Sequence, residues 1–514
     1  MAKKRVLSVA FKAYSQHQGM LLPPSLEEMI SQGHPVRTVN AVLDKIDIDP
    51  LLKKYKGGGC SSFHPRMLLK VLVYAYINNT YSSRKIEAAL KENIHYMWLS
   101  GMSTPDHNTI NRFRGERLKE VLEKIFTQVV LLLAQEGVLT IKDLYTDGSK
   151  IEANANRYTF VWGKSIKTSR ERIKKQLSEL WQYAQKIAAS EMDDTDPCGF
   201  DKIDAQKVEQ TIEKINEVLK DKPVAAKVKQ KLNYAKKNWS DNLKKYEEQE
   251  KIMGEQRSSY SKTDADATFM RLKEDHMKNG QLKPAYNLQI STNNQFITTY
   301  SLHQKTTDTN TLTKHLEKHQ TLFNEKPDTI TADAGYGSEE NYQWLQNNNI
   351  TAYVKHNQFD REQNKTIRDK NPFSPDKLHY NKERDCYYCP MGQQMNNVGT
   401  RTKKTSTGFT QIITVYQAKR CEGCPLRGVC HKGKGNRTIE VNHNLNHLRQ
   451  QADELLKSEQ GIKKRKRRPC DVEPVFGNIK QNHHFRRFML RGIEKVTVET
   501  GLLALAHNLR KKVA

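Results

Sequence analysis

The segment Thr329-Ile-Thr-Ala-Asp-Ala-Gly-Tyr-Gly337 decides the fold of this chain. Residues 329–332 predict a short strand that ends in Asp333, with a glycine close behind. Residues 139–145 predict a second strand, and Asp147 follows its end in a matching arrangement. Ligand sites of open α/β sheets gather at strand ends, so both aspartates are candidate ligands of a hard cation such as Mg²⁺. Each Asp-Gly pairing taken alone is also an ordinary turn.

Further strands and helices are predicted around these two segments. The chain predicts strands at 285–292, 296–302 and 350–354, with Asn293-Asn294 as a hairpin turn between the first two, and helices at 311–323 and 338–346. With a helical insertion after the first strand set aside, this order predicts an α/β fold, a mixed sheet flanked by helices.

The whole chain is expected to divide into seven parts. These are an N-terminal extension (1–56), a helical DNA-binding domain (57–137), the first part of the core (138–164), a helical hairpin insertion with heptad spacing (165–262), the second part of the core (263–357), a Cys-containing insertion (358–444) and a C-terminal helical part of the core with a third acid (445–514).

The N-terminal helical region is a candidate DNA reader. Two short helices and a basic third helix, which carries Arg112 and Arg114, are compatible with a helix-turn-helix arrangement. A plain helical bundle with a solvated basic face is the alternative.

The charge balance indicates a polyanion partner. The 514 residues include 85 Lys and Arg against 58 Asp and Glu, a net charge of +27, and basic side chains on phosphates release condensed counterions. Ribosome binding, a membrane surface or solubility are the alternatives. No apolar run reaches the roughly 20 residues that span a bilayer, and the N-terminus lacks the apolar region of a secretory signal. We therefore expect a cytoplasmic protein with reduced cysteines and no membrane partner.

A third acid stands in a basic neighbourhood. Glu473 follows the run 463–468, in which all six residues are Lys or Arg, and precedes Lys480, Arg486 and Arg487. If Glu473 is a metal ligand, the basic residues on either side of it would hold a DNA backbone. The alternative is a surface residue that balances the charge of those basic residues. Other carboxylates near the motifs rank lower, namely Asp143, Glu152, Asp264, Asp266, Glu339 and Glu340.

The segments around the three acids resemble bacterial insertion-sequence transposases of the DDE type. The resemblance rests on residues 147–162, 332–341, 473–480 and 485–492, and on the helical stretch 60–135. It implies an RNase H-like core with Asp147, Asp333 and Glu473 as catalytic residues that bind two Mg²⁺ or Mn²⁺ ions. It also implies cleavage at element ends and strand transfer into target DNA by a nucleoid-associated protein, with a homodimer on double-stranded DNA.

Two other functions remain open, an RNase H-like endonuclease without strand transfer and a non-catalytic DNA-binding repressor. Many members of the family carry a Tyr-x2-Arg-x3-Glu-x6-Lys signature around the third acid. Glu473 and Lys480 keep that spacing, whereas Pro469 and Lys466 stand at the Arg and Tyr positions. Arg468, one residue earlier, is the candidate replacement for the arginine. We expect DNA contacts from Lys480, Arg468, Arg486, Arg487, Arg112 and Arg114.

The cysteines predict a structural zinc site. Two Cys-x2-Cys pairs lie 31 residues apart, Cys386–Cys389 and Cys421–Cys424, with Cys430 nearby. The expected ligands are Cys389, Cys421, Cys424 and Cys430, with Cys386 as an alternative. Buried reduced thiols are the other interpretation.

Alternating aromatic residues follow the first aspartate. Tyr158, Phe160 and Trp162 keep the spacing of a strand, which favours core packing. A sharper hypothesis is that Trp162 stacks on an unpaired or flipped base near the cut.

Overall fold

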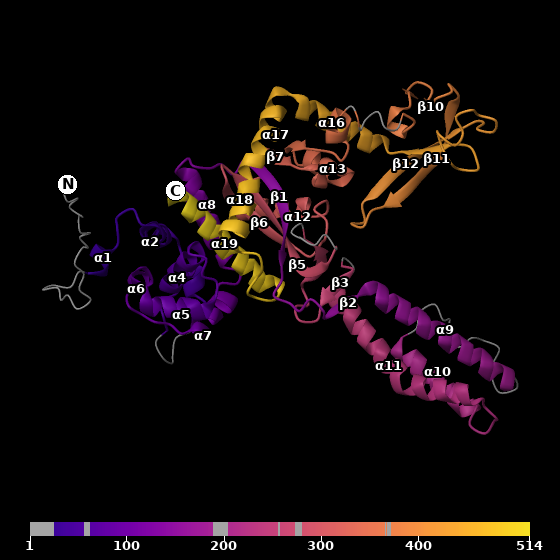
Figure 1. The fold of residues 1–514 in the computed structure, drawn as a ribbon, viewed down its shortest axis with the longest axis horizontal. Helices are drawn as coiled ribbons and strands as arrows, with labels where there is room; N and C mark the ends of the chain where they lie inside the picture. Colours follow the sequence, from indigo (N-terminus) through magenta and orange to yellow (C-terminus); the bar gives the residue numbers. More distant parts are fainter. Residues whose placement is uncertain are drawn as a thin grey trace, which may run out of the picture.

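The computed structural model describes residues 25–55, 62–188, 204–254, 257–272, 280–364, 366 and 372–513. A central sheet carries helices on its faces, a three-helix unit projects from one end, and a second, smaller sheet projects from another side (Figure 1). Gly57-Gly58-Gly59, at the expected boundary between the N-terminal extension and the helical domain, lies outside the described residues, as do Cys60 and Cys198.

The central sheet has six strands. They are β1 (Asp143–Glu152), β4 (Thr268–Arg271), β5 (Leu282–Asn293), β6 (Phe296–His303), β7 (Thr329–Ala332) and β8 (Thr351–Val354). The order is β4-β5-β1-β7-β8, with β6 also paired to β5. β5 is antiparallel to β1 and β6. β7 lies between β1 and β8 and is parallel to both. This mixed sheet with flanking helices confirms the predicted α/β, RNase H-like fold.

The first strand differs from its prediction. β1 runs to Glu152 because β5 pairs with it continuously from Tyr145↔Thr292 to Glu152↔Ala285. Asp147 therefore lies within β1 and not after its end. β7 pairs with β1 only as far as Tyr145. Asp333, directly after β7, consequently lies where the long strand passes the end of the short one.

The hairpin between β5 and β6 confirms the predicted turn, displaced by one residue. Asn294 and Gln295 have φ of 52° and 63°, the left-handed pair that a tight two-residue hairpin requires. Helices α12 (Leu312–Phe323) and α13 (Glu339–Asn347) agree with the predicted ones. Ser338 caps α13 by accepting the Asn341 N–H at 3.2 Å.

The N-terminal helices pack on the C-terminal helix. They are α1 (Leu26–Met29), α2 (Pro35–Lys45), α3 (Asp49–Leu52), α4 (Pro65–Ile77), α5 (Ser83–Glu92), α6 (Ile94–Ser100), α7 (His107–Arg112), the π-helical turn η1 (Phe113–Arg117) and α8 (Leu122–Gln135). Helix α19 (Ile493–Val513) contacts α4, α8 and β6. One continuous hydrophobic core joins these helices, one face of the sheet and the segment after Glu473.

The insertion after β1 contains three helices where two were predicted. α9 (Gly163–Ile187) and α11 (Ala226–Met253) cover the predicted heptads, and α10 (Ala205–Val218) packs against both. Their apolar faces form a core of their own. The unit is joined to the sheet through the paired strands β2 (Phe160–Trp162) and β3 (Ser259–Ser261) (Figure 1).

The Cys-containing part forms an antiparallel sheet that the sequence did not predict. Its strands are β9 (Tyr380–Asn381), β10 (Cys386–Tyr388), β11 (Gln394–Lys404), β12 (Thr410–Ala418) and β13 (Thr438–Val441). Nine consecutive residues of β11 are exposed, so the strand lacks the alternation of apolar and polar residues on which strand prediction depends. The short α14 (Phe359–Gln363) and η3 (Pro375–Lys377) precede it.

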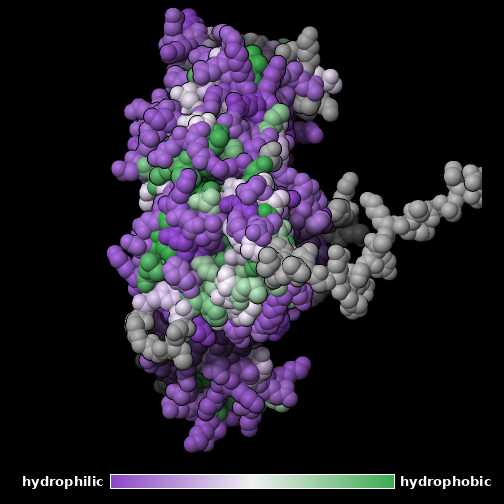
Figure 2. Space-filling view, turned by 90° about the vertical axis from the view of Figure 1, so that its left-hand side faces the viewer, coloured by the Kyte–Doolittle hydropathy of each residue, from purple (hydrophilic) through white to green (hydrophobic). Residues whose placement is uncertain are grey.

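The C-terminal part returns to the sheet as a series of helices. They are α16 (His443–Lys457), α17 (Glu459–Asp471), α18 (Glu473–Gly477), the π-helical turn η4 (Asn478–Asn482) and α19. No helix among the described residues is long and apolar enough to cross a bilayer. The face shown in Figure 2 is largely hydrophilic, with scattered hydrophobic patches.

Several histidines are buried in the interior as neutral rings. Burial lowers the pKa of His303, His319, His483 and His507 to about 4. In the unfolded chain these rings titrate near their ordinary pKa of about 6.5. Between pH 6.5 and 4 the unfolded state therefore binds more protons than the folded state, so acidification favours unfolding.

We expect the midpoint of thermal unfolding to fall as the pH is lowered from 7 to 4.5, measured by scanning calorimetry. His507→Gln keeps a donor for the Gln295 carbonyl, which His507 contacts at 2.9 Å, but has no titrating ring. Its midpoint should depend less steeply on pH than that of the unmodified chain. Identical slopes for the two proteins would contradict this assignment of the pH dependence.

Candidate active site

Three carboxylates from separate elements meet on one guanidinium. An Arg468 terminal nitrogen lies 3.2 Å from Asp147 Oδ1 and 3.8 Å from Asp333 Oδ2. Its other terminal nitrogen lies 3.3 Å from Glu473 Oε1. The Arg468 side chain is 13% exposed. The structure thus brings together the three predicted acids, which are 326 residues apart in sequence at their extremes, around one cation.

The two aspartates are each held by the backbone that follows them. Asp147 Oδ1 accepts the N–H of Gly148 at 2.9 Å, and Asp333 Oδ1 accepts the N–H of Gly335 at 2.8 Å. Asp333 thereby caps the 3₁₀ turn η2 (Ala334–Tyr336). These hydrogen bonds orient both carboxylates on the side that faces the guanidinium.

Glu473 is placed by a break between two helices. α17 ends at Asp471, Val472 intervenes, and Glu473 is the first residue of α18. Pro469 within α17 and Pro474 at the start of α18 each lack an N–H for the helical ladder. The Glu473 side chain is 55% exposed, whereas that of Asp147 is 14% exposed. The site is therefore open to solvent on the side of the third acid.

A fourth carboxylate, Asp308, is hydrogen-bonded to two side chains of β5 close to the site. Its Oδ1 accepts hydrogen bonds from Asn287 Nδ2 at 2.8 Å and Gln289 Nε2 at 2.9 Å, both from β5. The hydroxyl of Tyr336 donates to Gln289 Oε1. Burial, followed by the charges of Asp308, Asp147 and Asp333, raises the pKa of Tyr336. Tyr336 therefore stays a neutral donor.

Sequence reasoning missed this network. Asp308 lies in Lys305-Thr-Thr-Asp-Thr-Asn310, soon after the end of β6. The strand-end rule that selected Asp147 and Asp333 could have selected it. The loop it belongs to is tied to the second acid, because Thr309 Oγ1 donates to the Gly335 carbonyl at 2.8 Å.

The acids line a pocket of about 360 Å³ together with basic and polar residues. Its lining residues are Asp147, Gly148, Ser149, Asp333, Arg468, Glu473, Phe476, Gly477, Lys480 and Gln481. Lys480, which keeps the spacing of the family signature, lies on η4 at the same opening. The pocket has the composition of a cation site with a phosphate-binding rim.

The other predicted DNA contacts fall into two groups. Arg486 and Arg487 are exposed beside β1, and Arg487 Nε donates to the Ala153 carbonyl at 3.2 Å. Arg112 is also exposed. Arg114 is 3% exposed, and its guanidinium donates to the Tyr81 carbonyl at 2.7 Å. Arg114 therefore has a structural role in the described conformation and does not reach a DNA surface, which corrects its assignment.

The aromatic segment is more exposed than core packing predicts. Tyr158 is 79% and Phe160 47% exposed. Trp162 is half-buried, with its ring centroid 5.9 Å from that of Phe269 and 6.1 Å from that of Phe160. The structure thus places Trp162 in an aromatic cluster at the entry to the insertion, outside the acid pocket.

The four expected zinc ligands line one small cavity. Cys389, Cys421, Cys424 and Cys430 surround it, whereas Cys386 lies in β10 and does not. The sulfurs of Cys389 and Cys421 accept backbone N–H groups at 3.3 and 3.2 Å. Arg437 donates to Cys430 Sγ at 2.7 Å. All six described cysteines are free. The donor set fits zinc, although the thiols do not all lie within 4.8 Å of one another among the described residues.

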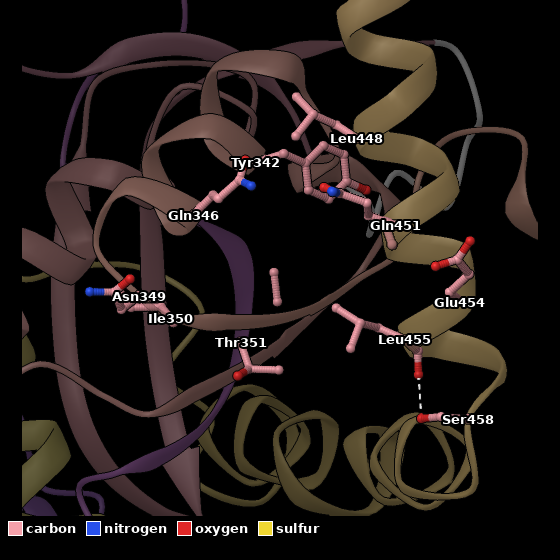
Figure 3. Close-up of a pocket in the computed structure, with 12 residues that line it drawn as sticks. Tyr342, Gln346, Asn349, Ile350, Thr351, Leu448, Gln451, Glu454, Leu455 and Ser458 are labelled. Atoms are coloured by element: carbon pink, nitrogen blue, oxygen red, sulfur yellow. Dashed lines mark hydrogen bonds between the residues drawn. The ribbon is translucent and has the colours of Figure 1, made fainter.

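Two other clusters lack the chemistry of the acid pocket. A pocket of about 670 Å³ beside β8, between α13 and α16, is lined by Tyr342, Leu448 and Leu455 among others and has one carboxylate, Glu454 (Figure 3). His356, Glu362 and Asp453 lie together, but Asp453 is paired with His356 and Lys457. The smaller pocket, which is lined by three carboxylates together with Arg468 and Lys480, is therefore the candidate functional site.

Comparisons with known families agree with this geometry. The family "Transposase DDE domain" matches residues 388–513, which include Glu473 and Arg468. The family "Transposase domain (DUF772)" matches residues 24–116. Curated proteins and solved structures give no match.

Both family matches confirm the resemblance to insertion-sequence transposases of the DDE type and indicate a transposase function. Transposases act on DNA, so the matches imply DNA binding. A DDE domain implies a polynucleotidyl transferase type of enzyme that uses a divalent metal ion.

Gly148 is expected to tolerate no side chain. A Cβ there would lie 2.3 Å from Gln289 Nε2 and 2.6 Å from Asp308 Oδ1. Gly148→Ala should push the two strands or the Asp308 loop apart and destabilise the fold by about 1–3 kcal/mol, the usual result of overpacking. Gly477→Ala is the control, because no atom lies within 4 Å of its Cβ position. Denaturant unfolding should show loss of stability for the first variant only.

Proposed function

We propose that this chain is a metal-dependent DDE transposase that cleaves DNA at the ends of an insertion sequence and joins the freed ends to target DNA. The observation that supports it is the convergence of Asp147, Asp333 and Glu473 on a single cation, beside β1 and the C-terminal end of β7 in an RNase H-like sheet. The family matches supply the coarser statement, a transposase.

The proposed metal ligands are the three carboxylates. Mg²⁺ and Mn²⁺ prefer oxygen donors, and Mg²⁺ is commonly held by one or two carboxylates together with substrate phosphates. A guanidinium already occupies the space between these acids, so the pocket attracts positive charge. A pair of ions bound there would activate the attacking oxygen and stabilise the leaving oxygen.

The reaction consists of two displacements at phosphorus. In the first, water forms a bond to the scissile phosphorus, the bond to the 3′-oxygen breaks, and the element end is left with a 3′-hydroxyl. In the second, that hydroxyl attacks a phosphodiester of the target, whose own 3′-oxygen leaves. The second step exchanges one phosphodiester for another and needs no external energy source. Lys480 at the rim would bind a non-bridging oxygen of the cut strand as a point charge.

The proposed DNA-binding surface runs from the acid pocket along the exposed basic side chains that follow Lys480 in the sequence. Arg486 and Arg487 are exposed on that side, and the net charge of +27 supports a large polyanion partner. The helices within 57–137 would contribute Arg112. Since two element ends must be held together before joining, we further propose a homodimer on DNA.

We expect Asp147→Ala to abolish both reactions, with a fall of about 1,000-fold or more, because metal ligation supplies several kcal/mol of transition-state stabilisation. The measurement uses labelled element-end DNA with Mg²⁺ or Mn²⁺ and a pre-cut end for the joining step. Asp360→Ala is the control, since Asp360 is 66% exposed, pairs with Lys355 at 2.9 Å and does not line the acid pocket.

The same assay separates the alternative functions. Cleavage without joined products from pre-cut ends would identify an endonuclease. DNA binding without cleavage by the unmodified chain would identify a repressor. Equal activity of Asp147→Ala and the unmodified chain would exclude the proposed site.

We also propose that Cys389, Cys421, Cys424 and Cys430 bind a structural Zn²⁺. Elemental analysis of the purified chain should then give one zinc per chain, and Cys424→Ser should lower that content. Cys470→Ser is the matched control, since Cys470 is exposed on α17, away from the cavity. Zinc contents that are equal in all three proteins would contradict the assignment.

A further inference from the structure

Arg468 has contacts that a simple DNA-binding side chain does not require. Its two terminal nitrogens bridge all three acids, and only 13% of the side chain is exposed to solvent. A side chain that only bound DNA would extend toward solvent, as Arg486 does. The Arg468 guanidinium instead contacts the three acids of its own chain in the structure without DNA.

Three carboxylates that share one pocket repel one another when no cation is present. Such groups either take up protons or recruit a positive charge. Arg468 supplies that charge from within the chain, because a guanidinium is always protonated. The acids can therefore lie close together in a chain that has not yet bound metal.

We propose that Arg468 is a positioning residue that occupies the cation position of the site and competes with the divalent metal ions for the three acids. This rests on the proposed function, since it takes the three acids as metal ligands. Metal binding would displace the guanidinium, which then becomes available to a DNA phosphate at the rim of the same pocket, near Lys480.

The contacts of Arg468 are suited to release. Its Nε is buried without a hydrogen-bond partner among the described residues, so neutral hydrogen bonds do not fix the head group there. The side chain is held by ion pairs with acids that a divalent cation binds more strongly. Pro469 follows it directly, and a proline inside a helix removes one backbone hydrogen bond, which weakens the ladder at this turn.

The test measures Mn²⁺ binding without DNA, by isothermal titration calorimetry on the full chain. Arg468→Gln keeps length and hydrogen-bonding capacity but removes the charge, and we expect it to bind Mn²⁺ at least tenfold more tightly than the unmodified chain. Arg468→Lys keeps the charge and should stay near the unmodified value. Without metal, Arg468→Gln should also unfold at a lower temperature, and Mn²⁺ should restore most of the difference.

Arg170→Gln is the matched control. Arg170 also bridges two carboxylates, Glu247 at 3.8 Å and Glu250 at 3.1 Å, and its Nε is likewise buried without a partner in the described chain. It lies on α9, away from the acids, so its replacement should leave Mn²⁺ affinity unchanged.

The outcomes distinguish this inference from the proposed function. If Asp147→Ala loses Mn²⁺ binding but Arg468→Gln binds it no more tightly than the unmodified chain, the metal site stands and competition by Arg468 is wrong. If Asp147→Ala binds Mn²⁺ like the unmodified chain, the metal site itself is wrong. If Arg468→Gln does not fold, Arg468→Ala prepared with Mn²⁺ present replaces it. Failure of the metal to stabilise either variant would also overturn the inference.

Discussion

The buried carboxylate of Glu499 joins segments that are far apart in sequence. It is fully buried on α19 and accepts the backbone N–H groups of Met489 and Leu490 at 3.0–3.1 Å. The Tyr76 hydroxyl contacts it, and the charge of Arg114 opposes the rise in pKa that burial gives the acid. Leaving a buried donor or acceptor without its hydrogen-bond partner typically costs about 1–3 kcal/mol. The N-terminal helices, α19 and the chain after the third acid are therefore joined at one buried group.

This anchor helps to explain how Glu473 keeps its place although its helix is short and its side chain is 55% exposed. The chain after it also attaches to the end of β1, where the Phe488 N–H donates to the Glu152 carbonyl at 2.9 Å and the Glu152 N–H to the Arg486 carbonyl at 3.3 Å. Before it, α17 packs on β7 and β8. The segments before and after Glu473 are thus both attached to the sheet that carries Asp147 and Asp333. The ion pairs of Arg468 then hold the three carboxylates together.

The sequence predicted the acids better than their surroundings. Predicted strand ends selected Asp147 and Asp333, and the basic neighbourhood of Glu473 together with the family resemblance selected the third acid, because those features are local in sequence. The pairing of Arg468 with all three depends on distances across the fold, which no local pattern contains. Arg114 shows the same limit, since its buried position depends on contacts with Tyr76 and Tyr81, which precede it by 38 and 33 positions. β1 was predicted too short because its second half is a strand only through pairing with β5, and β11 was missed because neither face of it is buried.

Each of the two insertions has a cluster of buried residues separate from the core that carries the acids. The α9–α11 unit has its own hydrophobic core and is joined through the paired strands β2 and β3, with the Gly163 N–H donating to the Ser258 carbonyl at 2.9 Å. The strands β9–β13 likewise have a separate cluster of buried residues. Because packing energies are local, changes inside either unit alter its own stability first. Glu499 and Arg468, which hold the segments that carry the three acids, lie outside both units.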